Sequence, residues 1–378
     1  MTTTIPQELA EEILDHLADD LPSLGACSLV CRAWVFPSRS RLFKTCYLDG
    51  HNARGFRDLS RSPDCTFLHN IHRIEAYQYL WADEGRYLGE IAPDLSSLTG
   101  VRELDMVLCF QRSASRVFFC GGFVAAFPHV TRLSLSFSAR NYEPEPGAPL
   151  IDTICLFPAL QELKIRPFYG MVVSDCSPNA VPPRELHRLD LDGDVLGPIL
   201  MWLNTSGHLP RVDSVTLSSL KPSLVPVVRA AMEQIGDALR YLRVDLTVLL
   251  AQWVRDDELT MLNLARNPNL RTLVVHDRPW DDIVLDASQM DLLLSRLTAP
   301  GLERLSLELN MLPYRQLHWA ALDVLLQPTQ FPRLRSVVVE CSRHGSAHDD
   351  HSFLYQALPL LQASGLLRVC YGPLFGYE

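Results

Sequence analysis

The stretch Leu302-Glu303-Arg304-Leu305-Ser306-Leu307 places aliphatic side chains at its first, fourth and sixth positions. The same six-residue phrase recurs along the chain, and its eleven copies are Ile71/Ile74/Ala76, Val101/Leu104/Met106, Val130/Leu133/Leu135, Leu160/Leu163/Ile165, Leu186/Leu189/Leu191, Val212/Val215/Leu217, Leu239/Leu242/Val244, Leu270/Leu273/Val275, Leu302/Leu305/Leu307, Leu334/Val337/Val339 and Leu366/Val369/Tyr371. From Ile74 to Val369 is 295 residues over ten steps, so the period averages 29.5 residues. A fixed period of this length is typical of repeat architectures.

Each phrase ends in an alternation that predicts a short strand. Turn residues precede many of the phrases, for example at 127–128 and 300–301. Between the phrases lie apolar stretches with helical spacing, such as 224–235 and 317–326. Because parallel strands need long crossovers, these stretches allow successive strands to stack side by side. The pattern therefore predicts an α/β solenoid.

The phrase and its period resemble those of the leucine-rich-repeat family over residues 65–378. The resemblance implies a curved parallel sheet on a concave face and helices on the convex face. The family's asparagine or cysteine after the strand falls at Cys109 and Asn310, whereas most other copies depart from it, so we expect an irregular solenoid over 46–378. Thr45-Cys46-Tyr47-Leu48 is expected to add an initial strand, and the phrase near Val369 is expected to cap the far end.

The front of the chain has a different pattern. From Pro6 to Leu17 the apolar residues follow one helical stripe, and acidic residues occupy the other side. A second apolar run begins after Asp20, and either Asp20 or Ser23 can cap a helix there. A third helical segment starts near Cys31, and Pro37 is expected to kink or restart it. Helices this short cannot bury so much apolar surface among themselves, so we expect a protein partner.

These residues read Ile-Pro-x-Glu-Leu-x-x-x-Ile-Leu-x-x-Leu, then Leu-x-x-Leu, then Ser-Leu-Val-Cys-Arg-x-Trp, and they closely resemble an F-box over residues 1–45. In that family the module docks on the Skp-type adaptor of a cullin–RING ubiquitin ligase, and the resemblance implies the same partners here. The positions that match the motif, and are expected to face the adaptor or to form the module core, are Pro6, Leu9, Ile13, Leu14, Leu17, Leu24, Leu29, Val30, Cys31 and Trp34.

Composition limits the classes of function. The chain has 378 residues and a formal net charge of −10, which argues against nucleic acid as the default partner. No apolar run approaches the roughly 20 residues that a membrane span needs, and Met1-Thr2-Thr3-Thr4 does not resemble a signal peptide. We therefore expect an intracellular protein, in the cytoplasm, the nucleus or both, whose cysteines are reduced.

Residues between the aliphatics of each phrase should line the concave face. In the C-terminal half of the chain the residues at these positions become acidic. Trp280 follows one of the predicted strands and has charged neighbours in the sequence. We expect a protein target to bind there, for example through a basic segment. The candidate target-binding residues are Tyr241, Asp245, His276, Trp280, Glu308 and Glu340.

The sequence lacks the common motifs of catalysis. No phosphate-binding loop, nucleophile elbow, His-Glu-x-x-His or dinucleotide fingerprint occurs. His344, His348 and His351 have one-turn spacings but lie in a polar stretch, so neither a metal nor another cofactor is expected. The resemblances thus imply a non-enzymatic subunit that recognises the substrate of an SCF-type ubiquitin ligase. The alternative is an adaptor-bound scaffold or sequestering protein that acts without ubiquitination.

Overall fold

The computed structural model describes residues 6–63, 65–78, 84–110, 122–139, 149–167, 171–174, 177–246, 264–277, 290–291, 294–341 and 347–371. The chain divides into two compact units, Met1–Glu185 and Leu186–Glu378. Within the described ranges, no helix combines the length and apolar character that crossing a membrane requires.

Unit 1 opens with a helical module, which consists of α1 (Gln7–His16), α2 (Leu21–Cys27) and α3 (Arg32–Leu42). Pro6 stands directly before α1, where its missing N–H costs nothing. Asp20 caps α2, because its side chain accepts hydrogen bonds from Ser23 N at 3.1 Å and Ser23 Oγ at 2.6 Å. Pro37 lies inside a continuous α3, so of the two predicted effects, a kink or a restart of the helix, the restart does not occur.

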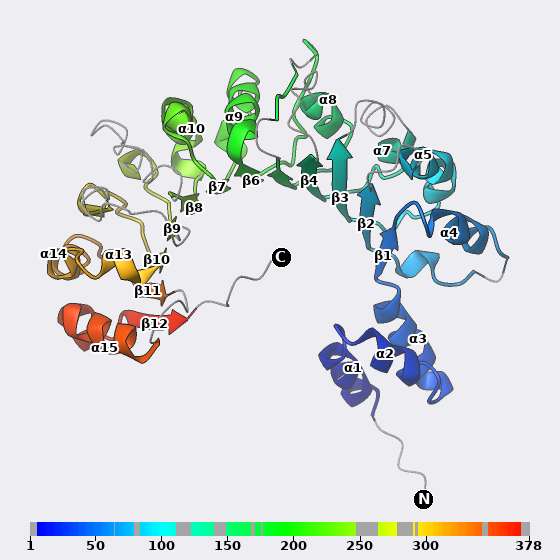
Figure 1. The fold of residues 1–378 in the computed structure, drawn as a ribbon, viewed down its shortest axis with the longest axis horizontal. Coiled ribbons are helices and arrows are strands. Elements are labelled where there is room, and N and C mark those ends of the chain that lie inside the picture. Colours follow the sequence, from blue (N-terminus) through cyan, green and yellow to red (C-terminus); the bar gives the residue numbers. More distant parts are fainter. Residues whose placement is uncertain are drawn as a thin grey trace, which may run out of the picture. The chain divides into compact units, whose positions relative to one another are not determined.

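The rest of unit 1 alternates strands with helices. Its strands are β1 (Thr45–Leu48), β2 (Arg73–Gln78), β3 (Glu103–Phe110), β4 (Arg132–Ala139) and β5 (Glu162–Arg166). Its remaining helices are α4 (Ala53–Ser60), η1 (Leu68–Asn70), α5 (Glu84–Leu95), α7 (Gly122–Ala125) and α8 (Leu150–Ile154). The strands pair in parallel in chain order, and the longer helices cover one face of the sheet (Figure 1).

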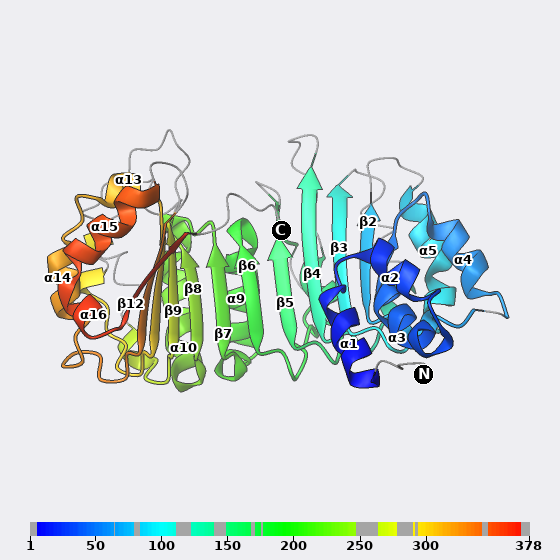
Figure 2. The same cartoon turned by 90° about the horizontal axis from the view of Figure 1, so that it is seen from below.

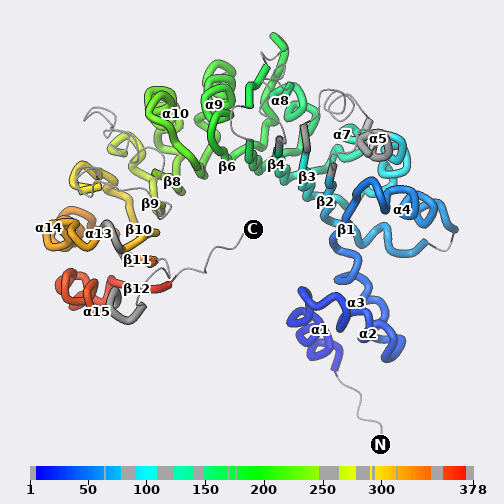
Figure 3. Tube along the Cα trace, viewed as in Figure 1, coloured from blue at the N-terminus to red at the C-terminus, as the bar shows by residue number. Residues whose placement is uncertain are grey.

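The predicted initial strand is confirmed. Figure 3 follows the chain from α3 directly into β1, which pairs with β2 so that Cys46 lies opposite Ile74. Burial raises the pKa of the Cys46 thiol to about 12, so this thiol stays protonated at neutral pH. The rings of Phe43 and Phe67 also meet, with centroids 4.8 Å apart. The helical module is therefore joined to the sheet by backbone pairing and by side-chain packing.

Unit 2 repeats the same plan. Its strands are β6 (Arg188–Asp192), β7 (Ser214–Ser218), β8 (Tyr241–Asp245), β9 (Thr272–Asp277), β10 (Arg304–Leu309), β11 (Ser336–Cys341) and β12 (Leu367–Tyr371). Its helices are η2 (Gly193–Val195), α9 (Leu196–Thr205), η3 (Leu209–Arg211), η4 (Pro222–Leu224), α10 (Val225–Ile235), η5 (Gly236–Ala238), η7 (Leu264–Arg266), α13 (Met311–Tyr314), α14 (Trp319–Leu325), α15 (Ala347–Ala357) and α16 (Pro359–Ala363). Figure 2 shows the strands of each unit side by side and running in one direction.

The aliphatic phrase sets the register of both sheets. In unit 1, Ile74, Leu104, Leu133 and Leu163 lie opposite one another, as their places in the phrase predict. In unit 2 the same holds from Leu189 to Val337. These side chains are buried, and burying one stabilises the fold by roughly 1.5–3 kcal/mol. The predicted α/β fold, in which N-terminal helices are followed by parallel strands that alternate with helices, is confirmed.

The last phrase is shifted by two residues from its predicted place. Val337 pairs with Leu367, whereas the phrase had placed Val369 opposite it. The sequence around Leu366, Leu367 and Val369 allows β12 to pair with β11 in two registers that differ by two residues. Because side chains alternate along a strand, both registers place Val369 on the same face of the sheet. The paired frame buries Leu367.

Candidate functional site

The helical module has its own small core. Leu14 of α1 and Leu24 of α2 are both 0% exposed, and Ala10 is nearly so. Arg41 ties α1 to α3: its Nε donates to Asp15 Oδ1 at 2.8 Å and its Nη2 to the Glu11 carbonyl at 3.3 Å. A further bond from Nη1 to the Pro37 carbonyl, at 3.0 Å, orients the guanidinium on its own helix. The module therefore holds its surface residues in a defined arrangement.

Several large apolar side chains are exposed on that surface. Leu9 and Ile13 of α1 are 51% and 41% exposed, and Leu29 and Val30, between α2 and α3, are 83% and 65% exposed. Scattered exposed aliphatics are common on proteins, but a small module that exposes several of them is typical of an interaction site. The apolar surplus predicted from the sequence is thus present at the surface of the module.

The structure separates the ten predicted adaptor-facing or module-core residues into groups. The exposed group is Pro6, Leu9, Ile13, Leu29, Val30 and Cys31. Leu17 and Trp34 are half-buried, so each has some surface available to a partner. Leu14 and Leu24 are fully buried, so they belong to the core of the module and have no free surface for an adaptor.

Two exposed apolar side chains of the module were missed by the sequence reasoning. Leu21, at the first position of α2, is 46% exposed, and Phe36 of α3 is 67% exposed. Phe36 stacks on His69 of η1, with ring centroids 6.5 Å apart. A large aromatic two residues after Trp34 was the available signal. Its exposure depends on how α3 packs, which the sequence pattern did not resolve.

The carboxyl group of Asp20, which caps α2, has a lowered pKa. The hydrogen bond from Ser23 Oγ, and after it the one from Ser23 N–H, lowers the pKa of the Asp20 carboxyl below its ordinary value. The cap is therefore ionised at neutral pH and would weaken only in acid, as pH falls through that lowered pKa. The turn between α1 and α2 keeps its geometry across the physiological range.

The sheet face away from the helices carries paired charges in unit 1. Arg73 donates to Asp105 at 2.6 Å and approaches Glu75 at 3.2 Å. Burial acts to lower the pKa of Arg73, but the attraction of Asp105 and Glu75 outweighs it and the pKa is raised. Arg132 likewise bridges Glu103 at 3.0 Å and Glu162 at 3.2 Å. Each of these two guanidinium groups is therefore shared by two carboxylates.

In unit 2 the same face contains the predicted target-binding residues. Asp245, His276, Glu308 and Glu340 lie in one row across β8 to β11, and Tyr241 begins β8. Trp280 lies outside the described residues, as do His344 and the side chains of His348 and His351. The structure thus brings together five of the six predicted residues.

Glu308 is not a free acid in this row. It is only 8% exposed, and its two carboxylate oxygens accept from Arg243 Nη1 at 2.9 Å and Nη2 at 2.7 Å. His276 Nδ1 lies 2.9 Å from Glu308 Oε2. The acidic character expected of this face is therefore reduced at Glu308, and Arg243 is a component that the sequence reasoning missed.

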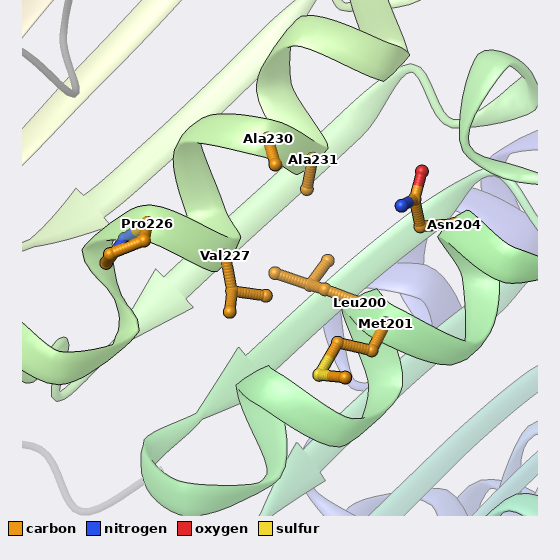
Figure 4. Close-up of a pocket in the computed structure, with 7 residues that line it drawn as sticks. All are labelled: Leu200, Met201, Asn204, Pro226, Val227, Ala230 and Ala231. Atoms are coloured by element: carbon orange, nitrogen blue, oxygen red, sulfur yellow. The ribbon is translucent and has the colours of Figure 1, made fainter.

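The helical side of unit 2 has a shallow apolar pocket of about 270 Å³ between α9 and α10 (Figure 4). Leu200, Met201 and Asn204 line it from α9, and Pro226, Val227, Ala230 and Ala231 line it from α10. Its lining has no ionisable or nucleophilic side chain, so the pocket offers shape and apolar contact only.

Comparison with known proteins gives no family assignment. No protein-family model and no curated protein sequence matches the chain. Among solved structures, TLR13 in its complex with ssRNA13 is similar, with a TM-score of 0.33 and 15% identity, over 73% of this chain and 40% of that chain. In the Rad7 and Elc1 complex of yeast, a chain is similar over 90% of both chains, with a TM-score of 0.36 and 12% identity. This chain spans less than half the length of the TLR13 chain.

Proposed function

We propose that the protein is the substrate-recognition subunit of an SCF-type ubiquitin ligase. The helical module would dock on a Skp-type adaptor, and the strand face of the solenoid would bind a protein target. The adaptor connects in turn to cullin and RING subunits. The chain would bring the target lysine close to the conjugating enzyme that carries the ubiquitin thioester. No residue of the chain itself would take part in the chemistry.

One observation carries this proposal: aliphatic side chains remain exposed on a module whose own core is already filled. Leu14 and Leu24 complete that core, while Leu9, Ile13, Leu29 and Val30 stay in contact with water. A partner that buried them would gain up to roughly 1.5–3 kcal/mol for each side chain. The F-box motif adds the identity of the expected partner, because the exposed residues belong to it.

The docking surface can be tested with a triple variant, Leu9→Ala/Ile13→Ala/Val30→Ala. Because each change removes an exposed side chain and leaves the module core intact, the fold should be retained. Each should weaken binding by about 1–2 kcal/mol, so we expect a loss of adaptor affinity of at least about 100-fold. The measurement is calorimetric titration with a purified Skp-type adaptor.

The matched control is Met201→Ala/Val324→Ala, which removes exposed apolar side chains from unit 2. This variant should bind the adaptor like the unaltered chain. Equal affinity in the triple variant, or an equal loss in the control, would contradict docking through the helical module. Recovery of cullin together with the adaptor would support a ligase, whereas recovery of the adaptor alone would indicate a scaffold.

For the target, Asp245 and Glu340 are the acidic residues of choice, because each is half-buried, whereas Glu308 is only 8% exposed. Reversing both to Lys should abolish capture of a basic target segment while adaptor binding persists. Unchanged capture would remove this face from the proposal.

A further inference from the structure

The chain is almost free of lysine. Of its 34 basic side chains, only Lys44, Lys164 and Lys221 are lysines, and the other 31 are arginines. Lysine is ordinarily among the commonest residues of globular proteins. A chain of 378 residues with three lysines therefore calls for a physical reason.

Ion-pair geometry explains only some of the arginines. Arg61 and Arg243 use the forked guanidinium, since each binds both oxygens of one carboxylate, of Asp94 and Glu308 respectively. Arg240, Arg304 and Arg333, in contrast, are exposed and form no ion pair in the part of the chain that the structure describes. A lysine would serve equally well for charge and solubility at such positions, yet arginine occupies them.

The two side chains also differ in nucleophilicity. A lysine ammonium can lose a proton and present a lone pair, whereas an arginine guanidinium stays protonated in proteins and its nitrogen lone pairs are delocalised. Replacing lysine by arginine thus keeps the positive charge and removes the amine that can be acylated.

The three lysines differ in their availability. Lys44, directly after α3, and Lys164, on β5, are exposed. Lys221 is not equally free, because its Nζ lies 2.5 Å from Asp194 Oδ1 and its side chain is 28% exposed. The described structure thus leaves Lys44 and Lys164 as the accessible lysine amines.

We propose that this lysine depletion makes the chain a poor acceptor of ubiquitin within its own ligase, with Lys44 and Lys164 as the residual acceptor sites. The inference rests on the proposed function. A subunit that holds targets close to a ubiquitin-loaded conjugating enzyme also lies close to that enzyme. Its own lysine amines therefore compete with those of the target. Removing them directs the transfer to the bound protein.

The reaction concerned is aminolysis of a thioester. A neutral lysine Nζ attacks the carbonyl carbon of the ubiquitin thioester on the conjugating enzyme, a C–N bond forms and the C–S bond breaks. The cysteine leaves as a thiolate, and the proton lost by the amine balances its charge. A guanidinium cannot take the first step, because it has no available lone pair at neutral pH.

The test restores lysines without changing charge. Arg240→Lys/Arg304→Lys/Arg333→Lys doubles the lysine number from three to six at exposed positions. Each chain is assembled with purified Skp-type adaptor, cullin, RING protein, activating and conjugating enzymes and ubiquitin. Mass spectrometry then counts the ubiquitin attached to the chain. We expect about twofold or more ubiquitin on the restored variant, and on the unaltered chain we expect it only at Lys44 and Lys164.

The lysine-free variant Lys44→Arg/Lys164→Arg/Lys221→Arg gives the baseline, and equal thermal midpoints confirm that the variants are folded. An amine-reactive ester adds a readout that does not need the ligase: Lys44 and Lys164 should acylate faster than Lys221. Assembly of the complex with equal modification of all chains would overturn this inference alone. Failure of the complex to assemble would overturn the proposed function, and this inference with it.

Discussion

The carboxylate of Glu308 is held by two side chains that come from different strands. Arg243 on β8 and Glu308 on β10 are separated by β9, so the two side chains together bridge the roughly 10 Å between these strands. Removing the guanidinium takes two hydrogen bonds from this buried carboxylate, which His276 also contacts. We expect Arg243→Ala to destabilise the protein by about 1–3 kcal/mol, a fall measured by urea unfolding.

Two controls separate charge from packing at this site. Arg243→Ala combined with Glu308→Gln should recover part of the loss, because no uncompensated charge remains. Arg304→Ala, at an exposed residue of the neighbouring β10, should stay within about 0.5 kcal/mol of the unaltered chain. A loss at Arg304 as large as that at Arg243 would show that the pair has no special role.

At the scale of elements, α16 depends on a side chain from another helix. Asp323 of α14 is 2% exposed and accepts from the backbone N–H of Leu360 at 2.8 Å and of Leu361 at 2.9 Å. These N–H groups belong to the first turn of α16, so Asp323 acts as a cap supplied from outside the helix. Asp323→Ala should cost about 2 kcal/mol and speed amide exchange at 360 and 361.

The neighbouring change Val324→Ala is the matched control, because its side chain is exposed on the same helix. It should leave both the urea midpoint and the exchange rates nearly unchanged. If exchange at 360 and 361 stays slow in Asp323→Ala, another group caps α16.

The elements also show how far the sequence could lead. Periodicity predicted the strands and their register from Ile74 onward because each phrase has a single frame that buries its aliphatics. The predicted register of β12 was wrong by two residues. Leu366 and Leu367 are adjacent there, and in unit 2 it is β11 that determines how β12 pairs. The pairing of Arg243 with Glu308, 65 residues apart, depends on the register and on rotamers together, so it could not be predicted from spacing.

The same limit applies to the docking residues. The helical stripe identified Leu9, Ile13 and Leu14 as one apolar set. In the folded module Leu14 is buried, whereas Leu9 and Ile13 remain exposed. Burial of Leu14 and exposure of Leu9 follow from the rotation of α1 on its neighbours. Spacing gives the stripe, and only packing divides it into core and surface.

At the scale of the whole molecule, a repeat array is stabilised mainly by contacts between adjacent repeats, so a local defect should stay local. Asp323→Ala in unit 2 should therefore lower the urea midpoint yet leave adaptor affinity within about twofold.

Arg41→Ala should have the opposite effects. It loosens α1 from α3 beside the docking residues, so adaptor affinity should fall by roughly three- to tenfold, while the exposed part of its ion pair contributes little stability. Titration with the adaptor and urea unfolding of both variants test this, and a loss of affinity in Asp323→Ala equal to that in Arg41→Ala would mean that the chain transmits strain along its length.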